Sequence, residues 1–212
     1  MFLQGSRPHH AFMLTHGLVK LVGTLPSGRQ TIVGLRFPGQ WLDASAHLLR
    51  TSHPVSAIAL VDCGICKIDA DRFLAILGSN ARAAGLLIEN EAVDLHNVGV
   101  TLMEFKVLNA EQRLERLLTT LAFALGKESA DGKTRRLRLP LSDSDIAELI
   151  GISAQHLSTL KVSLHRTRRV QWIDKKLVDL LNVRAMPLSD EGQPNYQDIG
   201  YPAGSAFHHQ LD

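Results

Sequence analysis

The first third of the chain carries short apolar or alternating segments that turn residues separate. LVKLVGTL, QTIVGLRF and VSAIALV follow one another between Leu18 and Ile68, with Pro-Ser-Gly at 26–28 and Pro-Gly-Gln at 38–40 between them. Strands of all-antiparallel folds recur at about this spacing of 8–12 residues. The pattern predicts an antiparallel β-barrel over residues 1–80, ending in a short helix over residues 69–77.

A long helix is predicted next, over residues 81–108, because apolar residues recur at steps of three and four. The residues of this seam are Ile88, Ala92, Leu95, Gly99, Leu102 and Phe105. A repeat near 3.5 residues suits the pairing of two helices. Gly99 weakens an isolated helix, yet at a seam it lets two backbones approach closely. We expect a dimerisation helix; packing on the chain's own domain is the alternative.

The most informative segment is DSDIAELIGISAQHLSTLKV, residues 143–162, which fits a helix-turn-helix. Ala147 supplies a small contact between the helices, and Gly151 accepts the positive φ of the turn. Ser142 and Ser153 are suited to cap the two helices. The apolar residues that two crossed helices would bury are Ile146, Ile150, Ile152, Leu157 and Leu160. An ordinary helical hairpin is the alternative, but it need not satisfy all these positions together.

This segment lies within a larger C-terminal pattern. A helix is predicted over residues 110–125, and the strands 170–173 and 177–180 form a small hairpin after the helix-turn-helix. A helix-turn-helix followed by such a hairpin is a winged helix, which we place at residues 109–186. Residues 187–212 are polar and without periodicity, and we expect a flexible tail there.

The net charge of +2 over 212 residues is unevenly distributed. Residues 1–105 hold 8 Lys/Arg and 8 Asp/Glu, a net charge of 0; residues 106–186 hold 15 and 9, a net of +6; residues 187–212 hold none and 4, a net of −4. The basic excess therefore coincides with the helix-turn-helix. Contact with nucleic-acid phosphates requires such a local excess.

Other features of the sequence narrow its class. No apolar run reaches the roughly 18–20 residues of a membrane span, and the N-terminus lacks the order of a secretion signal. We therefore expect a cytoplasmic protein without membrane contact. The two cysteines, Cys63 and Cys66, are too few for a disulfide scaffold.

The order of these parts, and several motifs within them, resembles the Crp/Fnr family of bacterial transcription regulators. The segments that carry the resemblance are MFLQG, HGLVKLV, GLRFPGQWL, AIALVDCGICKIDADRFLAIL and the helix-turn-helix, and together they cover roughly residues 1–183. The resemblance implies an α+β fold with a cyclic-nucleotide-binding-like barrel or jelly roll, which is shortened here at its start. It also implies a homodimer on palindromic double-stranded DNA, RNA polymerase as a partner, a signal received in the barrel, and no enzymatic activity.

The cassette that would hold a cyclic nucleotide departs from the family pattern. Cyclic-nucleotide binders place Gly-Glu where this chain has Asp43-Ala44, and Arg-Ser or Arg-Thr where it has His53-Pro54. Ala44 cannot accept a bond from a ribose hydroxyl, Pro54 lacks an N–H, and Asp43 brings a negative charge to the phosphate position. His53 is a weak cation near neutral pH. Cyclic AMP is therefore not expected, and the effector stays unknown.

Cysteines and histidines offer further candidate sensors. The N-terminal cysteine set that the family's oxygen sensors use for an iron–sulfur cluster is absent. Cys63 and Cys66 lie three apart on a predicted strand and so face opposite sides, which favours apolar packing over redox or metal chemistry. The histidines His9, His10, His16, His47 and His53 show no HxH or HExxH spacing, so we expect no metal, although some family members use haem.

The predicted DNA contacts follow from the geometry of a helix-turn-helix, whose second helix enters the major groove. Gln155 can bond to adenine N6 and N7, and Ala154 or Thr159 can pack on a thymine methyl group. The base-edge candidates are Ser153, Ala154, Gln155, Ser158 and Thr159. The phosphate candidates are Lys161, His165, Arg166, Arg168, Arg169, Lys175 and Lys176. Well-studied family members carry other side chains here, which implies a different half-site.

Two other classes of protein fit the sequence less well. A metal-dependent cupin-like barrel would need clustered histidines and carboxylates on its strands, and that spacing is absent. A cyclic-nucleotide-binding module acting on a partner protein would leave the helix-turn-helix and the basic segment without a role.

Overall fold

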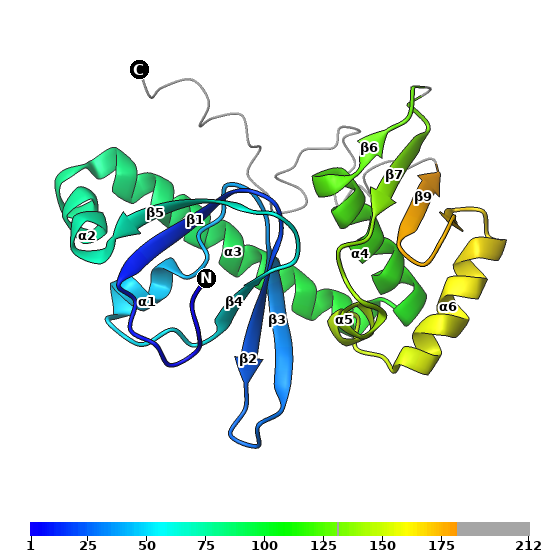
Figure 1. Ribbon diagram of the computed structural model, residues 1–212, viewed down its shortest axis with the longest axis horizontal. Helices are drawn as coiled ribbons and strands as arrows, with labels where there is room; N and C mark the ends of the chain where they lie inside the picture. Colours follow the sequence, from blue (N-terminus) through cyan, green and yellow to red (C-terminus); the bar gives the residue numbers. More distant parts are fainter. Residues whose placement is uncertain (131, 182–212) are drawn as a thin grey trace. The chain divides into compact units, whose positions relative to one another are not determined.

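The computed structural model of the chain describes residues 1–130 and 132–181. The fold is α+β, and the described residues divide into two compact units, one within residues 1–97 and one that begins at Val98 (Figure 1). The predicted tail, residues 187–212, lies outside the described residues.

The N-terminal unit is built on two antiparallel sheets. Its strands are β1 (His10–His16), β2 (Val19–Thr24), β3 (Gln30–Arg36), β4 (Ser56–Ala59) and β5 (Gly64–Asp69). One sheet has the order β3-β2-β4 and the other pairs β1 with β5. The antiparallel prediction is confirmed, but the prediction of a closed barrel is wrong for the described strands. Only isolated bridges, Phe2 with Ala57 and Met13 with Trp41, extend the pairing, and β4 is too short to continue it.

Three helices complete this unit. They are α1 (Ala44–Leu49), α2 (Ala70–Ser79) and α3 (Ala81–Val107), of which α3 continues into the second unit. The first core cluster joins the sheets through Phe2, Leu14, Val19, Leu21, Leu42 and Ala57. A second cluster joins β1 to the helices through Ala11, Ala44, Phe73 and Leu87. The short helix predicted at residues 69–77 corresponds to α2, whose first turn is capped by the Asp69 carboxylate.

The long helix α3 buries one face on its own unit and leaves another uncovered. On the covered face, the Arg36 guanidinium lies 3.3 Å from Asp94 Oδ2, and Gln40 Nε2 donates to Asp94 Oδ1 at 2.8 Å. Burial raises the pKa of the Asp94 carboxyl, and the Arg36 charge opposes that shift. The predicted seam lies elsewhere: Leu95 is 73% exposed and Leu102 is 60% exposed. The described chain therefore does not cover the seam itself.

The C-terminal unit consists of three further helices and one sheet. The helices are α4 (Ala110–Leu125), α5 (Asp143–Leu149) and α6 (Ala154–Arg166). The strands are β6 (Lys127–Glu128), β7 (Thr134–Arg138), β8 (Val170–Trp172) and β9 (Leu177–Leu181), in the order β6-β7-β9-β8. Strand β7 was not predicted, because four of its five residues are polar and only Leu137 is fully buried. Helix α6 packs against α4, α5 and β8 around Leu157, Leu160 and Leu164.

Candidate functional site

Helices α5 and α6 begin where their capping residues predict. The Ser142 hydroxyl accepts from the backbone N–H of Asp145 at 3.1 Å, and the Asp145 carboxylate accepts from the N–H of Ser142 at 3.1 Å. This reciprocal pair is a capping box at the start of α5. At α6, the Ser153 hydroxyl accepts from the N–H of His156 at 3.2 Å. Both helix starts are therefore fixed by contacts within three residues along the chain.

The turn between the two helices depends on Gly151. Its φ is +70°, a region that residues with a Cβ adopt only with strain, and this confirms the predicted positive φ. The N–H of Ile152 donates to the carbonyl of Ala147 at 2.9 Å and closes the turn. Ile146, Ala147 and Ile150 are all buried. Local sequence thus sets the direction in which α6 leaves the turn.

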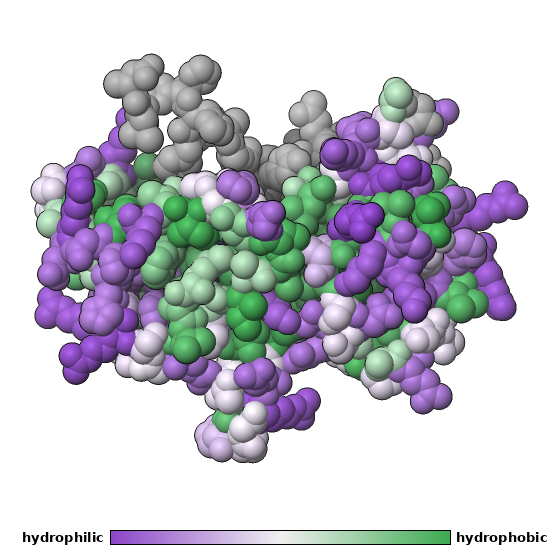
Figure 2. Space-filling model, in the orientation of Figure 1, coloured by the Kyte–Doolittle hydropathy of each residue, from purple (hydrophilic) through white to green (hydrophobic). Residues whose placement is uncertain are grey.

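The first half of α6 presents polar side chains over a buried apolar side. Leu157 and Leu160 are buried, as predicted, whereas all five base-edge candidates, Ser153, Ala154, Gln155, Ser158 and Thr159, are exposed. The hydroxyls of Ser158 and Thr159 donate to carbonyls one turn back, at 3.2 and 3.4 Å. The Gln155 amide has no partner among the described residues. Figure 2 shows mainly hydrophilic surface around α6 on the face drawn.

The seven phosphate candidates fall into two groups. Three of them are engaged within the unit: the Lys161 ammonium lies 2.5 Å from Asp143 Oδ1 and 4.5 Å from the Trp172 ring centroid. Arg169 pairs with the Glu115 carboxylate at 3.1 Å, and Lys176 Nζ donates to the Leu141 carbonyl at 2.8 Å. The candidates without a partner in the described part of the chain are His165, Arg166, Arg168 and Lys175. Only this second group has charges that the fold does not use.

Part of the basic excess before α5 is also structural. The Arg136 guanidinium makes two bonds of 2.7 Å to the Asp179 carboxylate and so joins β7 to β9. Arg135 donates to the Ala122 carbonyl at 3.1 Å and lies over the Phe123 ring. The count of 15 Lys/Arg in residues 106–186 therefore overstates the number of cations that a nucleic acid could meet.

The predicted effector pocket is closed by its own side chains. His53 Nδ1 lies 2.7 Å from Asp43 Oδ2, and both side chains are almost completely buried, at 2% and 5% exposure. The Asp43 carboxylate also accepts from the Ser45 hydroxyl and caps α1 through the N–H of Ala46. The Phe2 ring stacks on the His53 imidazole with centroids 3.8 Å apart. Ala44 is buried, whereas Pro54 is exposed, so the structure brings Asp43 and His53 together and pairs them with each other.

The cysteines and histidines of the described residues lie in separate contacts, although the ring centroids of His47 and His53 are 6.4 Å apart. Cys63 and Cys66 are both free thiols, and Cys66 pairs with Met13 across β5 and β1. Across residues 1–130 and 132–181, no three His, Cys, Asp or Glu side chains are grouped as metal ligands would be.

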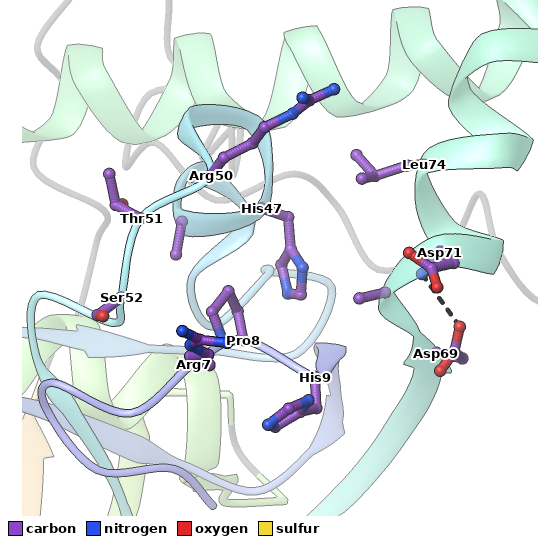
Figure 3. Close-up of a pocket in the computed structure, with 12 residues that line it drawn as sticks. Arg7, Pro8, His9, His47, Arg50, Thr51, Ser52, Asp69, Asp71 and Leu74 are labelled. Carbon is purple, nitrogen blue, oxygen red and sulfur yellow. Dashed lines mark hydrogen bonds between the residues drawn. The ribbon is translucent and has the colours of Figure 1, made fainter.

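Sequence reasoning missed a surface hollow of about 540 Å³ in the N-terminal unit. It lies between the segment before β1, helix α1 and the start of α2, and Figure 3 shows the His47 imidazole projecting from α1 between these walls. Arg7, His9, Arg50 and Asp71 are among its lining residues. None of the four predicted pocket residues lines it. Because its walls come from three separate segments, no local pattern in the sequence indicates it.

Among the described histidines, His47 and His53 are the two that are buried, and they differ in their partners: His53 pairs with Asp43, whereas His47 Nε2 is left without one. His47 is 4% exposed, packs edge-on against Phe73, and its Nε2 has no hydrogen-bond partner among the described residues. Burial lowers the pKa of His47, a backbone bond at His10 opposes the shift, and the nearby His53 adds to it. Burial therefore favours the neutral form of the imidazole.

Comparisons with known proteins agree with this architecture. The sequence profile of the cyclic nucleotide-binding domain matches residues 1–80. The nitrogen fixation regulation protein FixK of Rhizobium meliloti is 23% identical over 189 residues, which is 88% of this chain and 81% of FixK.

Two solved structures share the fold. FixK2 from Bradyrhizobium japonicum has a TM-score of 0.72 at 18% identity, over 87% of this chain and 88% of FixK2. TTHB099, a CRP-family transcriptional regulator from Thermus thermophilus, has a TM-score of 0.70 at 18% identity, over 86% and 88% of the two chains. Among the described residues, no helix is both long and apolar enough to cross a membrane. Residues 1–80 thus match the cyclic nucleotide-binding domain, and the fold over most of the chain is similar to that of FixK2 and TTHB099, in agreement with the resemblance of the sequence to the Crp/Fnr family.

Proposed function

We propose that this protein is a homodimeric, sequence-specific DNA-binding regulator that uses residues 109–186 as a winged helix-turn-helix. One observation carries the proposal: α6 exposes a row of polar side chains at its N-terminal half while Leu157 and Leu160 anchor its other side. A helix held in this way can enter the major groove without losing its packing. The turn at Gly151 and both helix caps support the same interpretation.

Base recognition is assigned to the exposed face of α6. The unpartnered Gln155 amide can donate to and accept from one adenine edge, and the Ala154 methyl group can pack on a thymine methyl group. Ser158 and Thr159 can turn their hydroxyls from the helix carbonyls to a base at little cost, because those bonds are exposed. Ser153 caps the helix, so its contribution is to direct the N-terminus of α6 toward the DNA.

Phosphate contacts are assigned to the cations that the fold leaves free. Arg166 is the last residue of α6 and Arg168 follows the helix, while Lys175 lies in the turn between β8 and β9, the wing of the proposed motif. His165 adds a cation only when protonated. Lys161, Arg169 and Lys176 instead support the positions of α6 and the wing, because their charges are engaged by Asp143, Glu115 and the Leu141 carbonyl.

Dimerisation is assigned to the uncovered seam of α3. Ile88, Leu95 and Leu102 are 68%, 73% and 60% exposed, spaced seven residues apart. Apolar side chains at this spacing are stabilised when a second helix covers them. A second copy of the chain supplies an identical seam, and twofold symmetry matches a palindromic operator.

Cyclic AMP is not proposed as the effector. A cyclic phosphate would need a cation at position 53 and space near position 43, but the buried pair of His53 and Asp43 occupies both. We propose that an unidentified signal acts through the N-terminal unit, and that RNA polymerase is the partner through which the bound dimer acts.

The test is selection of bound sequences from a random DNA pool by the purified protein without added ligand. We expect a palindromic consensus of two half-sites. The Q155A variant should select the same palindrome with one base pair relaxed on each side. A pool that stays random while salt-sensitive binding persists would contradict sequence-specific reading by the protein alone.

A further inference from the structure

We infer that Phe105 and Arg113 lock the end of α3 to the turn before α6, so that they act as positioning residues for the DNA-reading helix. The inference rests on the proposed function, since it assigns a cause to the placement of α6 in a dimer. All the residues involved belong to the unit that begins at Val98.

Arg113 ties three segments together from the first turns of α4. Its Nε donates to the Ile150 carbonyl at 2.9 Å, in the turn that ends α5. Its Nη1 donates to the Leu108 carbonyl at 2.6 Å, at the junction of α3 and α4. The planar guanidinium holds its donors in a fixed geometry, so both carbonyls are kept in one arrangement. A lysine has a single charged nitrogen and cannot reproduce both bonds in this geometry.

Phe105 fills the space between this guanidinium and Gly151. The Arg113 guanidinium carbon lies 5.0 Å from the Phe105 ring centroid, within the range of a cation–π contact. On the other side, a Cβ added at Gly151 would come within 2.8 Å of Phe105 Cε1. The ring therefore lies directly against the backbone of the turn. Phe105 was predicted as a seam residue, but the structure gives its ring this second contact.

An ion pair also holds the junction of α3, α4 and the Gly151 turn, which we call the corner. The Arg116 side chain of α4 pairs with the Glu104 carboxylate of α3, and both side chains are about four-fifths buried. Helix α4 thus binds the last turns of α3 at two successive positions on its own surface. The corner is therefore held by the Phe105 ring, two hydrogen bonds from Arg113 and the ion pair of Arg116 with Glu104.

The consequence concerns the distance between two recognition helices. Leu102 of the seam lies three residues before Phe105, so pairing of two α3 helices at Leu102 fixes the position of each locked corner. Each corner in turn fixes its own Gly151 turn and the start of α6. A dimer built in this way should accept a narrow range of half-site spacings, because half-site spacing follows the separation of the two reading helices.

The first test measures spacing preference on the palindrome obtained by selection. Operators are prepared with the two half-sites moved apart or together by one or two base pairs. For the unaltered protein, we expect a change of two base pairs in spacing to lower the binding affinity at least about tenfold. This loss is of the same order as that caused by one mismatched base pair. The F105A and R113K variants should bind the operator of the selected spacing about tenfold more weakly than the unaltered protein does. Their affinity for operators with shifted half-sites should change little. The spacing preference should then fall below about threefold.

The matched control is K106A. Lys106 lies next to Phe105 on α3, is exposed, and has no partner in the described part of the chain. This variant should keep the spacing preference of the unaltered protein. Loss of affinity by equal factors on every spacing in F105A and R113K would overturn the inference, as would an unchanged spacing preference.

The second test needs no DNA and therefore separates this inference from the proposed function. G151A introduces both backbone strain at positive φ and the contact with Phe105, whereas in the F105A background only the strain remains. G151A should raise the unfolding equilibrium constant by some factor in the unaltered protein. We expect the corresponding factor in the F105A background to be at least about threefold smaller. Equal increases in both backgrounds would show that Phe105 does not support the turn, even if the DNA selection succeeds.

Discussion

The pocket around Asp43 and the exposed face of α6 both concentrate polar side chains, but they use them in opposite ways. In the pocket, Asp43 and His53 bond to each other and are almost fully buried. On α6, Gln155 has no partner among the described residues, and the neighbouring hydroxyls bond only to their own helix. A buried polar group stabilises the fold when it is paired, whereas an exposed unpaired group is available to a ligand.

This contrast shows that resemblance to a ligand-binding family does not by itself establish a ligand-binding pocket. Residues 1–80 match the cyclic nucleotide-binding domain, but the Asp43 carboxylate and the His53 imidazole, at two of the predicted pocket positions, are paired with each other. The C-terminal unit keeps its candidate surface open. The two sides of the contrast can be tested separately.

The largest effect is expected on the closed side, from D43A. The substitution leaves His53 buried without its partner and removes the cap of α1. We expect the free energy of unfolding to fall by about 3 kcal/mol, from the unmatched buried group and the lost cap together. Chemical denaturation measures it. The control D62A removes an exposed carboxylate and should change stability by less than about 0.5 kcal/mol. Equal losses of stability in D43A and D62A would contradict a stabilising role of the pair of Asp43 and His53.

The open side predicts the reverse for Q155A. Its stability should stay within about 0.5 kcal/mol of the unaltered protein, because the amide is exposed. Discrimination at one base pair of each half-site should fall by about 1–3 kcal/mol. Binding to operators that vary at each position measures this loss. Q30A, which alters an exposed glutamine on β3, serves as the control and should leave the sequence preference intact.

A smaller effect should distinguish free from engaged cations. R168A should weaken binding to every sequence and reduce the slope of log K against log salt by about 0.9, the value for one phosphate contact. K161A should leave that slope unchanged and instead lower stability modestly, because Lys161 links Asp143 to the Trp172 ring. Salt titrations on one operator compare the two variants. Equal changes of slope would contradict the division of the cations.

The smallest effect concerns pH and His47. Because burial lowers the pKa of His47 in the folded protein, the unfolded chain binds this proton more strongly. Stability should therefore be fully present above the unfolded-state pKa and fall as the pH decreases from about 7.5 to about 5.5. Thermal unfolding at the two pH values measures the loss. The H47Q variant should show a smaller difference in stability between the two pH values. An unchanged difference would mean that other titratable groups cause it.

The C-terminal helices could be predicted from sequence because their determinants are local. Ser142, Gly151 and Ser153 act through residues one to four positions away, and the buried leucines of α6 follow the helical period. Strand β7 could not be predicted because its three arginines give it no apolar alternation. Arg136 of this strand bonds to Asp179, which lies more than forty residues later in the sequence.

The N-terminal site was predictable only in part. The sequence showed that Asp43 and His53 do not suit a cyclic phosphate, but their pairing depends on how a ten-residue segment folds back. Closure of the predicted barrel depends on strand register, and a bulge between β2 and β3 alters it locally. The contact of Arg113 with the Ile150 carbonyl spans 37 residues and had no local signal.

The paired Asp43 and His53 also bear on ligand discovery for this protein. A compound that enters the pocket must first separate two buried, hydrogen-bonded side chains and displace the Phe2 ring from the imidazole. The apparent affinity equals the intrinsic affinity multiplied by the fraction of molecules in which the pair is already separated. If that fraction were about one in a hundred, the apparent affinity would be about a hundredfold weaker. Screens for small molecules should therefore include D43A beside the unaltered protein, since a compound specific for this pocket would register first on the variant in which the pair is absent.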